Sequence, residues 1–274
     1  MRSPGIYFLY ILFSFALSLE TSAQAKKYTH ADTLKGTYSK QRSWWDVLHY
    51  DLHVSFNATD SSVKGYNRID YKVLEPYGVL QLDLMEPMSI DSVIEGKSRC
   101  YWIRDGNSWF VSLHKEQMRG EINNITVFFH GKPHVAVMPP WDGGVIWSKD
   151  PKGNPWISIA CQGMAAQVWF PNKDHMLDEA DSCDLYVTCP KNLITVSNGR
   201  LKSIDMNDQG SVFHWKTVSP INNYNIIPYI GKYVNFKDTL QGENGPLDLD
   251  FWVLEDNFGK AKKQFQQVKP MIHC

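Results

Sequence analysis

The first residues in this chain whose types and spacing could support chemistry are two histidines and an aspartate on one segment. His49, Asp51 and His53 combine two imidazoles with a carboxylate, and these are ligand types that zinc prefers. Alternate residues of an extended strand point to the same face, and successive ones lie about 6.6 Å apart. Because three ligands along a single strand converge poorly on one ion, we interpret this triplet as a solvated polar face.

A second cluster of titratable residues follows Pro171. Its carboxylates and its one imidazole belong to Asp174, His175, Asp178, Glu179 and Asp181. Carboxylate oxygens are the ligands that calcium prefers, but this spacing does not match an EF-hand loop. We therefore interpret the cluster as a polar loop that precedes a strand.

Four tryptophans gather in the central part of the sequence, at Trp141, Trp147, Trp156 and Trp169. Exposed aromatic rings on a β domain can stack on sugar rings, so a carbohydrate-binding module is one open interpretation. Tryptophan also fills cores and domain interfaces, which leaves the alternative of buried or interface residues. A serine triad has no support, because the chain contains no G-x-S-x-G motif.

The elements that must position these residues are predicted to be strands. Residues 48–56 alternate between apolar and polar types, which is the pattern of a strand with one buried face. Similar runs recur through the chain, and Asp105-Gly106 between two of them predicts a hairpin turn. Many short strands at regular spacing predict a mostly β fold, an antiparallel, saddle-like double sheet or sandwich.

The central part of the sequence also carries a signature that spans residues 156–174. Gln162 stands nine residues before Pro171, and Asp174 stands three residues after it. Three further segments surround this signature in order between residues 44 and 254, at 49–65, 190–199 and 223–233. Together the four segments resemble the N-terminal β domain of the aminopeptidase N-like zinc metallopeptidases, the gluzincin aminopeptidases.

The resemblance implies a β domain that packs against a thermolysin-like catalytic domain and closes one wall of its cleft. In that family the catalytic domain supplies G-x-M-E-N and H-E-x-x-H, whose histidines hold zinc. Neither motif occurs in this chain. Gly163-Met164 does not match G-x-M-E-N, because two alanines follow it. We therefore predict no catalytic residue, metal ligand or cofactor here, and we expect zinc in the missing catalytic domain. Alone, the chain is predicted to be inactive.

The resemblance assigns one substrate-binding residue, Gln162. By register it matches the Gln or Glu that reaches from the β domain to the amino-terminal end of the peptide substrate. A carboxamide can accept a hydrogen bond from an ammonium but adds no charge attraction. The second polar residue that many members place two positions earlier is Ala160 here. The alternative is a buried glutamine at a strand end that satisfies backbone groups.

Both ends of the sequence differ in character from this β region, which we place at residues 43–254. Arg2, the apolar run 6–19 and the small residues Ala23 and Ala25 predict a signal peptide over residues 1–25, and therefore export to the periplasm or outside the cell. Residues 26–42 are polar and aperiodic, which favours a linker. Apolar residues at three- and four-residue spacing predict an amphipathic helix within residues 255–274. We interpret that helix, which has no glycine cap, as the truncated start of the catalytic domain.

Composition limits the choice of partners. The formal net charge is −1, which leaves no electrostatic footprint for nucleic acid. The apolar run near the start is shorter than the roughly 20 residues that a membrane span needs, so no transmembrane segment is expected after signal cleavage. The expected partners are the protein's own catalytic domain and a peptide substrate. Two other possibilities stay open: an exported carbohydrate- or peptide-binding module, and a scaffold whose zinc site has decayed.

Overall fold

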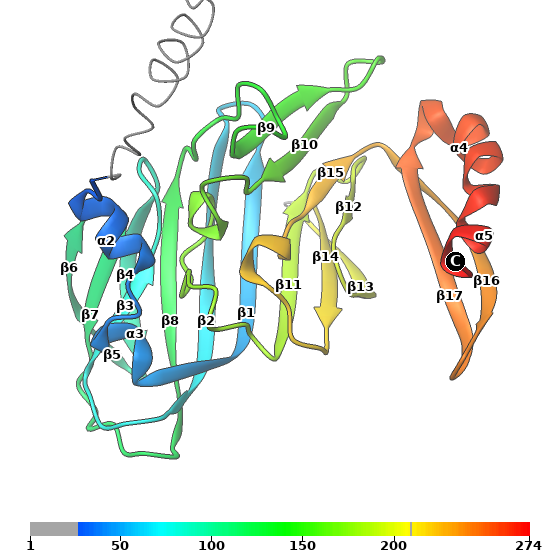
Figure 1. The fold of residues 1–274 in the computed structure, drawn as a ribbon. Helices are drawn as coiled ribbons and strands as arrows, with labels where there is room; N and C mark the ends of the chain where they lie inside the picture. The colour runs from blue at the N-terminus through cyan, green and yellow to red at the C-terminus, as the bar shows by residue number, and fades with distance from the viewer. Residues whose placement is uncertain (1–26, 209) are drawn as a thin grey trace, which may run out of the picture.

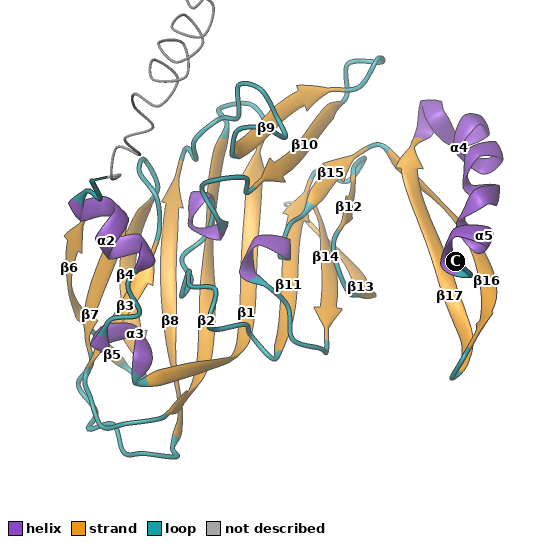
Figure 2. Ribbon diagram, viewed as in Figure 1, coloured by secondary structure: helices purple, strands orange, loops and turns teal. Residues whose placement is uncertain are grey.

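The computed structural model describes residues 27–208 and 210–274 (Figures 1 and 2). The predicted signal peptide, residues 1–25, lies outside these ranges. The described chain forms strands β1 to β17 in four sheets and a helical segment at its C-terminal end. The prediction of a mostly β fold is confirmed.

The largest sheet has eight strands in the order β13-β14-β11-β1-β2-β8-β4-β5. Its bounds, in the same order, are Arg200–Asn207, Gly210–Thr217, Ser182–Cys189, Trp45–Asn57, Ser62–Val73, Ile122–Gly131, Ser89–Glu95 and Ser98–Arg99. Its pairs are antiparallel except one, because β1 and β11 run parallel. A parallel pair needs a long crossover connection, and here that connection contains nine other strands. This parallel pair is an exception within an otherwise antiparallel sheet.

Three smaller sheets complete the fold. One contains β12 (Ile194–Val196), β15 (Tyr229–Gly231), β10 (Pro155–Ala160) and β9 (Gly144–Lys149), and another contains β3 (Val79–Asp83), β7 (Ser108–Ser112) and β6 (Tyr101–Asp105). The third pairs β16 (Tyr233–Gly242) with β17 (Gly245–Leu254). The hairpin predicted at Asp105-Gly106 is confirmed, and Gly106 has the positive φ of 58° that its turn requires.

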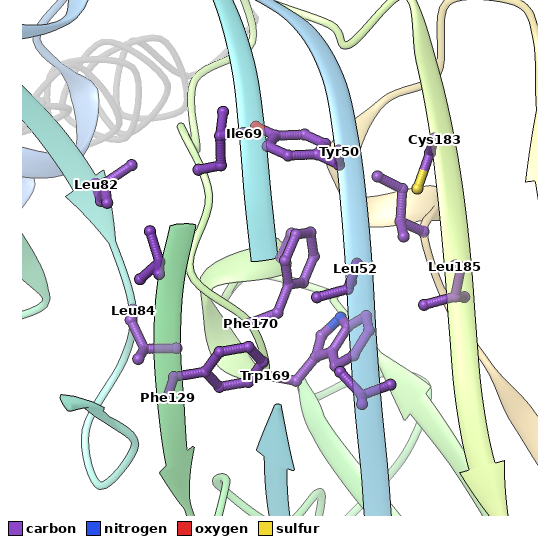
Figure 3. Packing of buried hydrophobic residues seen from close by; sticks show 14 of the residues in the cluster. Tyr50, Leu52, Ile69, Leu82, Leu84, Phe129, Trp169, Phe170, Cys183 and Leu185 are labelled. Carbon is purple, nitrogen blue, oxygen red and sulfur yellow. The ribbon is translucent and has the colours of Figure 1, made fainter. Parts of the chain in front are cut away.

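The core lies against the buried face of the eight-stranded sheet. Tyr50 and Leu52 of β1 point into it, as their alternation predicts, and are fully buried. Trp169 and Phe170, from the segment between β10 and β11, pack against these strands (Figure 3). The ring of Phe170 meets that of Tyr50 edge to face at 6.0 Å between centroids, a favoured aromatic geometry. The signature segment is therefore anchored in the core by Trp169 and Phe170.

From residue 27 onward, the segment predicted to be a linker forms two short helices instead, α2 (His30–Gly36) and α3 (Lys40–Ser43). The reason is Arg42, which is fully buried. Its guanidinium donates to both carboxylate oxygens of Asp83 at 2.8 and 2.7 Å, and also to the carbonyls of Leu34, Lys35 and Thr37. A buried bidentate pair of this kind fixes both helices onto the β domain.

The amphipathic helix predicted near the C-terminal end is present as α4 (Phe258–Gln264), a 3₁₀ turn η4 (Phe265–Gln267) and α5 (Val268–Ile272). These elements lie beside the β16–β17 hairpin (Figure 1). The rings of Phe236 and Phe251 on the hairpin contact Phe258 and Phe265 at centroid distances between 5.1 and 6.0 Å. No helix in the described ranges is both long and apolar enough to cross a membrane.

Candidate functional site

Gln162 lies in the loop that follows β10, at a cavity of about 680 Å³. Lys35 from α2, Ala160, Tyr224 and Tyr229 also line this cavity. The Gln162 side chain is exposed, and within the described residues it has no hydrogen-bond partner. The alternative of a buried glutamine that satisfies backbone groups therefore does not describe its position. The carboxamide is free to meet a ligand.

The backbone of this loop is tightly constrained. The amides of Met164 and Ala165 both donate to the carbonyl of Cys161, at 3.1 and 2.8 Å. Ala165 has φ 65° and ψ −171°, a region that is essentially reserved for glycine. On the other side, a Cβ added to Gly143 would come within 2.6 Å of the Gln162 carbonyl oxygen. Only glycine at position 143 allows this close approach, so two neighbouring segments set the position of Gln162.

Asp174, the last residue of the signature, binds the backbone just after the Gln162 loop. Its carboxylate accepts a hydrogen bond from the Gln167 amide at 3.1 Å. Burial, followed by the charge of Asp83, raises the pKa of Asp174 to about 6. Burial, and then the charge of Asp174, raises the pKa of the Cys161 thiol to about 12. Since the thiolate is the nucleophilic form of cysteine, Cys161 is not an activated nucleophile despite lining the cavity.

One charged residue of the site, Lys35, has no signal in the sequence. Its ammonium donates to the carbonyl of Gly163 at 2.9 Å, and its own carbonyl accepts from Arg42. Lys35 therefore bridges α2 and the Gln162 loop across a sequence separation of 128 residues. It lies in the segment interpreted as a linker, and only the burial of Arg42 brings it to the cavity.

Part of the acidic cluster after Pro171 is buried in the protein. Asp178 is buried, forms an ion pair with the buried Lys173 and accepts from the Val47 amide at 3.3 Å. The Lys173 ammonium also lies 4.6 Å from the centroid of the Trp45 ring. This cluster is thus in part a buried ion pair and not simply a polar loop. The difference arises because β1 packs directly over it.

The triplet on β1 is more enclosed than a solvated face. The His53 ring is stacked between Tyr66 and Tyr186, at centroid distances of 4.4 and 4.1 Å, and its Nε2 lies 2.9 Å from Asp51 Oδ1. His49 Nδ1 lies 2.8 Å from the Ser182 hydroxyl. Across the part of the chain that the structure describes, no three His, Cys, Asp or Glu side chains are arranged to hold a metal.

The four tryptophans do not form a common platform. Trp169 is buried, Trp147 is half-buried, and Trp156 donates from Nε1 to the Tyr233 hydroxyl at 2.8 Å. Trp141 is the exception, with 79% of its surface exposed. It belongs to residues 137–141, which we call the apolar loop.

The apolar loop has a defined conformation although its side chains are exposed. The Asp142 carboxylate accepts hydrogen bonds from the amides of Val137 and Met138 at 2.6 and 2.7 Å. Both of these residues are exposed, like Trp141, and Pro140 from the same loop lines the Gln162 cavity. The structure therefore presents an ordered apolar surface beside the cavity.

Comparisons with known proteins give the class of this fold. Neither a protein-family model nor a curated protein sequence matches the chain. Solved structures of an M1 zinc metallopeptidase do match. A mutant of the enzyme from Deinococcus radiodurans aligns with a TM-score of 0.68 and 17% identity, covering 81% of this chain and 50% of that one. The expected fold of an aminopeptidase N-like β domain is confirmed.

Two further structures align almost as well. One is a two-domain M1 zinc metallopeptidase mutant bound to L-tryptophan, and the other is a mutant of the Deinococcus radiodurans enzyme bound to a Tyr-Ser-Ala substrate. Each aligns with a TM-score of 0.66 and 17% identity, over 78% of this chain and 49% of the other. The chain thus spans about half the length of the structures it matches. At this identity the likeness defines the fold, and the activity of the whole protein is inferred below.

Proposed function

We propose that this chain is the N-terminal, non-catalytic part of an exported zinc aminopeptidase. In this proposal the β domain packs on a catalytic domain and lines the part of the cleft that receives the amino-terminal end of a peptide. Gln162 is the substrate-binding residue. Zinc is assigned to that catalytic domain, because the solved structures of similar fold are of M1 zinc metallopeptidases.

The observation that carries the proposal is the position of Gln162. A polar side chain that is exposed, unpartnered within the described residues and held in place by a constrained backbone is suited to binding. Its carboxamide oxygen can accept a hydrogen bond from an ammonium. The fold likeness adds support, since a structure of similar fold holds a Tyr-Ser-Ala substrate. A domain of this kind would therefore supply one wall of a peptide cleft.

The apolar loop supports the packing part of the proposal. Contiguous exposed apolar side chains, particularly beside a binding cavity, are typical of interaction surfaces. Val137, Met138 and Trp141 are between 65% and 87% exposed, yet Asp142 holds their backbone in one conformation. An ordered loop loses little conformational entropy when it docks. We assign this surface to the catalytic domain.

The assignment of Gln162 is tested by kinetics on the full-length protein. A charge-assisted hydrogen bond contributes roughly 1.5–3 kcal/mol, so Gln162→Ala is expected to lower kcat/KM on aminoacyl p-nitroanilides about ten- to hundredfold. Because the side chain is exposed and unbonded, the melting temperature is expected to stay the same. Gln162→Glu is expected to strengthen recognition of free amino termini, because it restores a carboxylate facing the ammonium.

Peptides with a blocked amino terminus serve as the control, because they present no cation. They are expected to gain nothing from Gln162→Glu. An unchanged kcat/KM in Gln162→Ala would contradict the assignment, and so would a large loss of thermal stability without a change in the kcat/KM of the folded fraction. Absence of chelator-sensitive hydrolysis by the wild-type full-length protein would contradict the aminopeptidase proposal itself.

Export rests on the N-terminal sequence alone. The positive residue Arg2, the apolar run and the Ala23-x-Ala25 site are typical of a cleaved signal peptide. N-terminal sequencing of protein from the exported fraction is expected to begin at Gln24 or Lys26. Recovery of protein that starts at Met1 from the cytosol would contradict export.

A further inference from the structure

The cavity at Gln162 has an unusual charge balance for a site that receives an ammonium. Among the described residues that line it, Lys35 carries the one formal charge, and none is Asp or Glu. The neutral polar side chains that line it can all donate as well as accept hydrogen bonds, and they are Ser158, Gln162, Tyr224, Asn225 and Tyr229. They can therefore serve a ligand of either charge, and the one cation, with no carboxylate beside it, makes the wall favour an anion over a second cation.

Lys35 is exposed, but its ammonium is held at this wall by a hydrogen bond. One N–H of its ammonium is used at the Gly163 carbonyl, 2.9 Å away, which leaves two donors for a ligand. Its backbone is fixed by Arg42, whose guanidinium donates to the Lys35 carbonyl at 3.1 Å while it pairs with Asp83. A positioned cation loses less conformational entropy on binding than a free lysine side chain.

The acidic groups near Lys35 do not cancel this charge at the cavity surface. Asp83 is buried and already paired with Arg42 through both carboxylate oxygens. Asp174 interacts electrostatically with Lys35, but it accepts from the Gln167 amide and does not line the cavity. The ammonium of Lys35 is therefore the charged group that a ligand in the cavity would meet.

We propose that Lys35 makes this cavity select peptides that place a carboxylate close to the free amino terminus. This inference rests on the proposed peptide-binding function and names its substrate class. The Gln162 carboxamide suits such a ligand, because its oxygen can accept from the ammonium while its NH₂ donates to the carboxylate. The carboxylate has two sources, an acidic side chain on the first residue or the C-terminus of a dipeptide.

Kinetics on the full-length protein test the first source. The matched substrates are the p-nitroanilides of glutamate and glutamine, which differ only in the charge of the side chain. Wild type is expected to prefer glutamate about fivefold, the upper range of one partly exposed ion pair, and Lys35→Met is expected to bring this ratio close to one. Lys72→Met removes the same charge from an exposed site on β2 that does not line the cavity, and it is expected to leave the ratio unchanged.

Binding measurements test the second source and separate this inference from the proposed function. Calorimetry compares Glu-Ala amide, Gln-Ala amide and free Gln-Ala on wild type and Lys35→Met. A Lys35-dependent preference for free Gln-Ala over its amide would identify the C-terminal carboxylate as the source. Lys35-dependent binding of Glu-Ala amide without any hydrolysis would contradict the aminopeptidase proposal but support the inference. Hydrolysis with a charge preference that Lys35→Met does not change would overturn the inference alone. If the protein shows neither hydrolysis nor Lys35-dependent binding, both the aminopeptidase proposal and the inference about Lys35 are overturned.

Discussion

The ionisation of Asp174 offers the sharpest test of the electrostatics beneath the site. Asp174 is largely buried, lies near the charge of Asp83, and accepts a hydrogen bond from the Gln167 amide. Burial is the largest of these effects, and it raises the pKa of the carboxyl from its ordinary value of 3.8 to about 6. The substitution Asp174→Asn keeps the shape and the hydrogen-bond acceptor but removes the charge.

The size of the effect follows from the pKa difference. Each pKa unit corresponds to about 1.4 kcal/mol, so ionising Asp174 costs the folded state roughly 3 kcal/mol more than the unfolded chain. Because the folded pKa is the higher one, the folded state binds more protons between the two values. The stability from Asp174 is fully present below pH 3.8, declines as the pH rises and is lost above about pH 6. Relative to wild type, Asp174→Asn should gain roughly 3 kcal/mol between about pH 4 and pH 7.

Urea unfolding followed by tryptophan fluorescence at several pH values between 4 and 8 measures this difference. Asp150→Asn is the control with the opposite sign, because hydrogen bonds, first from Asn154, lower the pKa of this exposed carboxyl. The stability from Asp150 is present above its ordinary pKa and is lost as the pH falls. Asp150→Asn should therefore be less stable than wild type at neutral pH, and this difference in the free energy of unfolding should disappear in acid. Parallel pH profiles for wild type and Asp174→Asn would refute the account of Asp174 as a buried, electrostatically disfavoured acid.

Two further predictions concern the segments that hold the site. Arg42→Met leaves the Asp83 carboxylate buried without its cation, which should lower the free energy of unfolding by about 3–5 kcal/mol. Arg68 on β2 forms a partly exposed ion pair with Asp70 at 3.1 Å, so Arg68→Met should cost about 1 kcal/mol or less, and similar losses for the two variants in urea titrations would contradict this difference. Ala165→Gly relieves a backbone conformation that costs about 1–3 kcal/mol, partly offset by about 0.5–1 kcal/mol of added chain entropy, so a raised melting temperature is expected and a lowered one would show that Ala165 is unstrained.

Strand β1 shows how far periodicity alone determines the fold. The alternation in residues 48–56 correctly predicts a strand with one buried face, because burial acts on every second side chain. The pairing of that strand was not predictable in the same way. Its parallel partner β11 begins at Ser182, far along the chain, and no local pattern encodes such a contact.

The segment 229–236 shows the limit of the same method. Its β-branched and aromatic residues favour one continuous strand, whereas the chain leaves one sheet at Gly231 and enters another at Tyr233. The change of sheet depends on tertiary packing, here the contact of Gly231 with the Trp156 and Tyr233 side chains.

For the candidate site, the motif located Gln162 and Asp174 but not the charged residue that lines the cavity. Lys35 and Arg42 lie in a polar segment that has neither apolar periodicity nor a recognised motif. Charged residues in such a segment are usually solvated, so nothing local distinguished Arg42, which is fully buried, from its neighbours. Its partner Asp83 lies 41 residues away. Buried ion pairs of this kind become apparent only when the tertiary structure brings the two residues together.

The guanidinium of Arg42 contacts two parts of the protein, and in this way it links the N-terminal helices to the Gln162 cavity. One side of the guanidinium pairs with Asp83 at the end of β3, and the other binds the last carbonyls of α2, including that of Lys35. Burial, and after it the charge of Asp83, raises the pKa of Asp174, whose carboxylate accepts from the Gln167 amide after the Gln162 loop. A single buried pair therefore connects the cation and the carboxamide that face the cavity. Loss of Arg42 should weaken the preference for acidic peptides even in the protein that remains folded, because Lys35 would lose its fixed position.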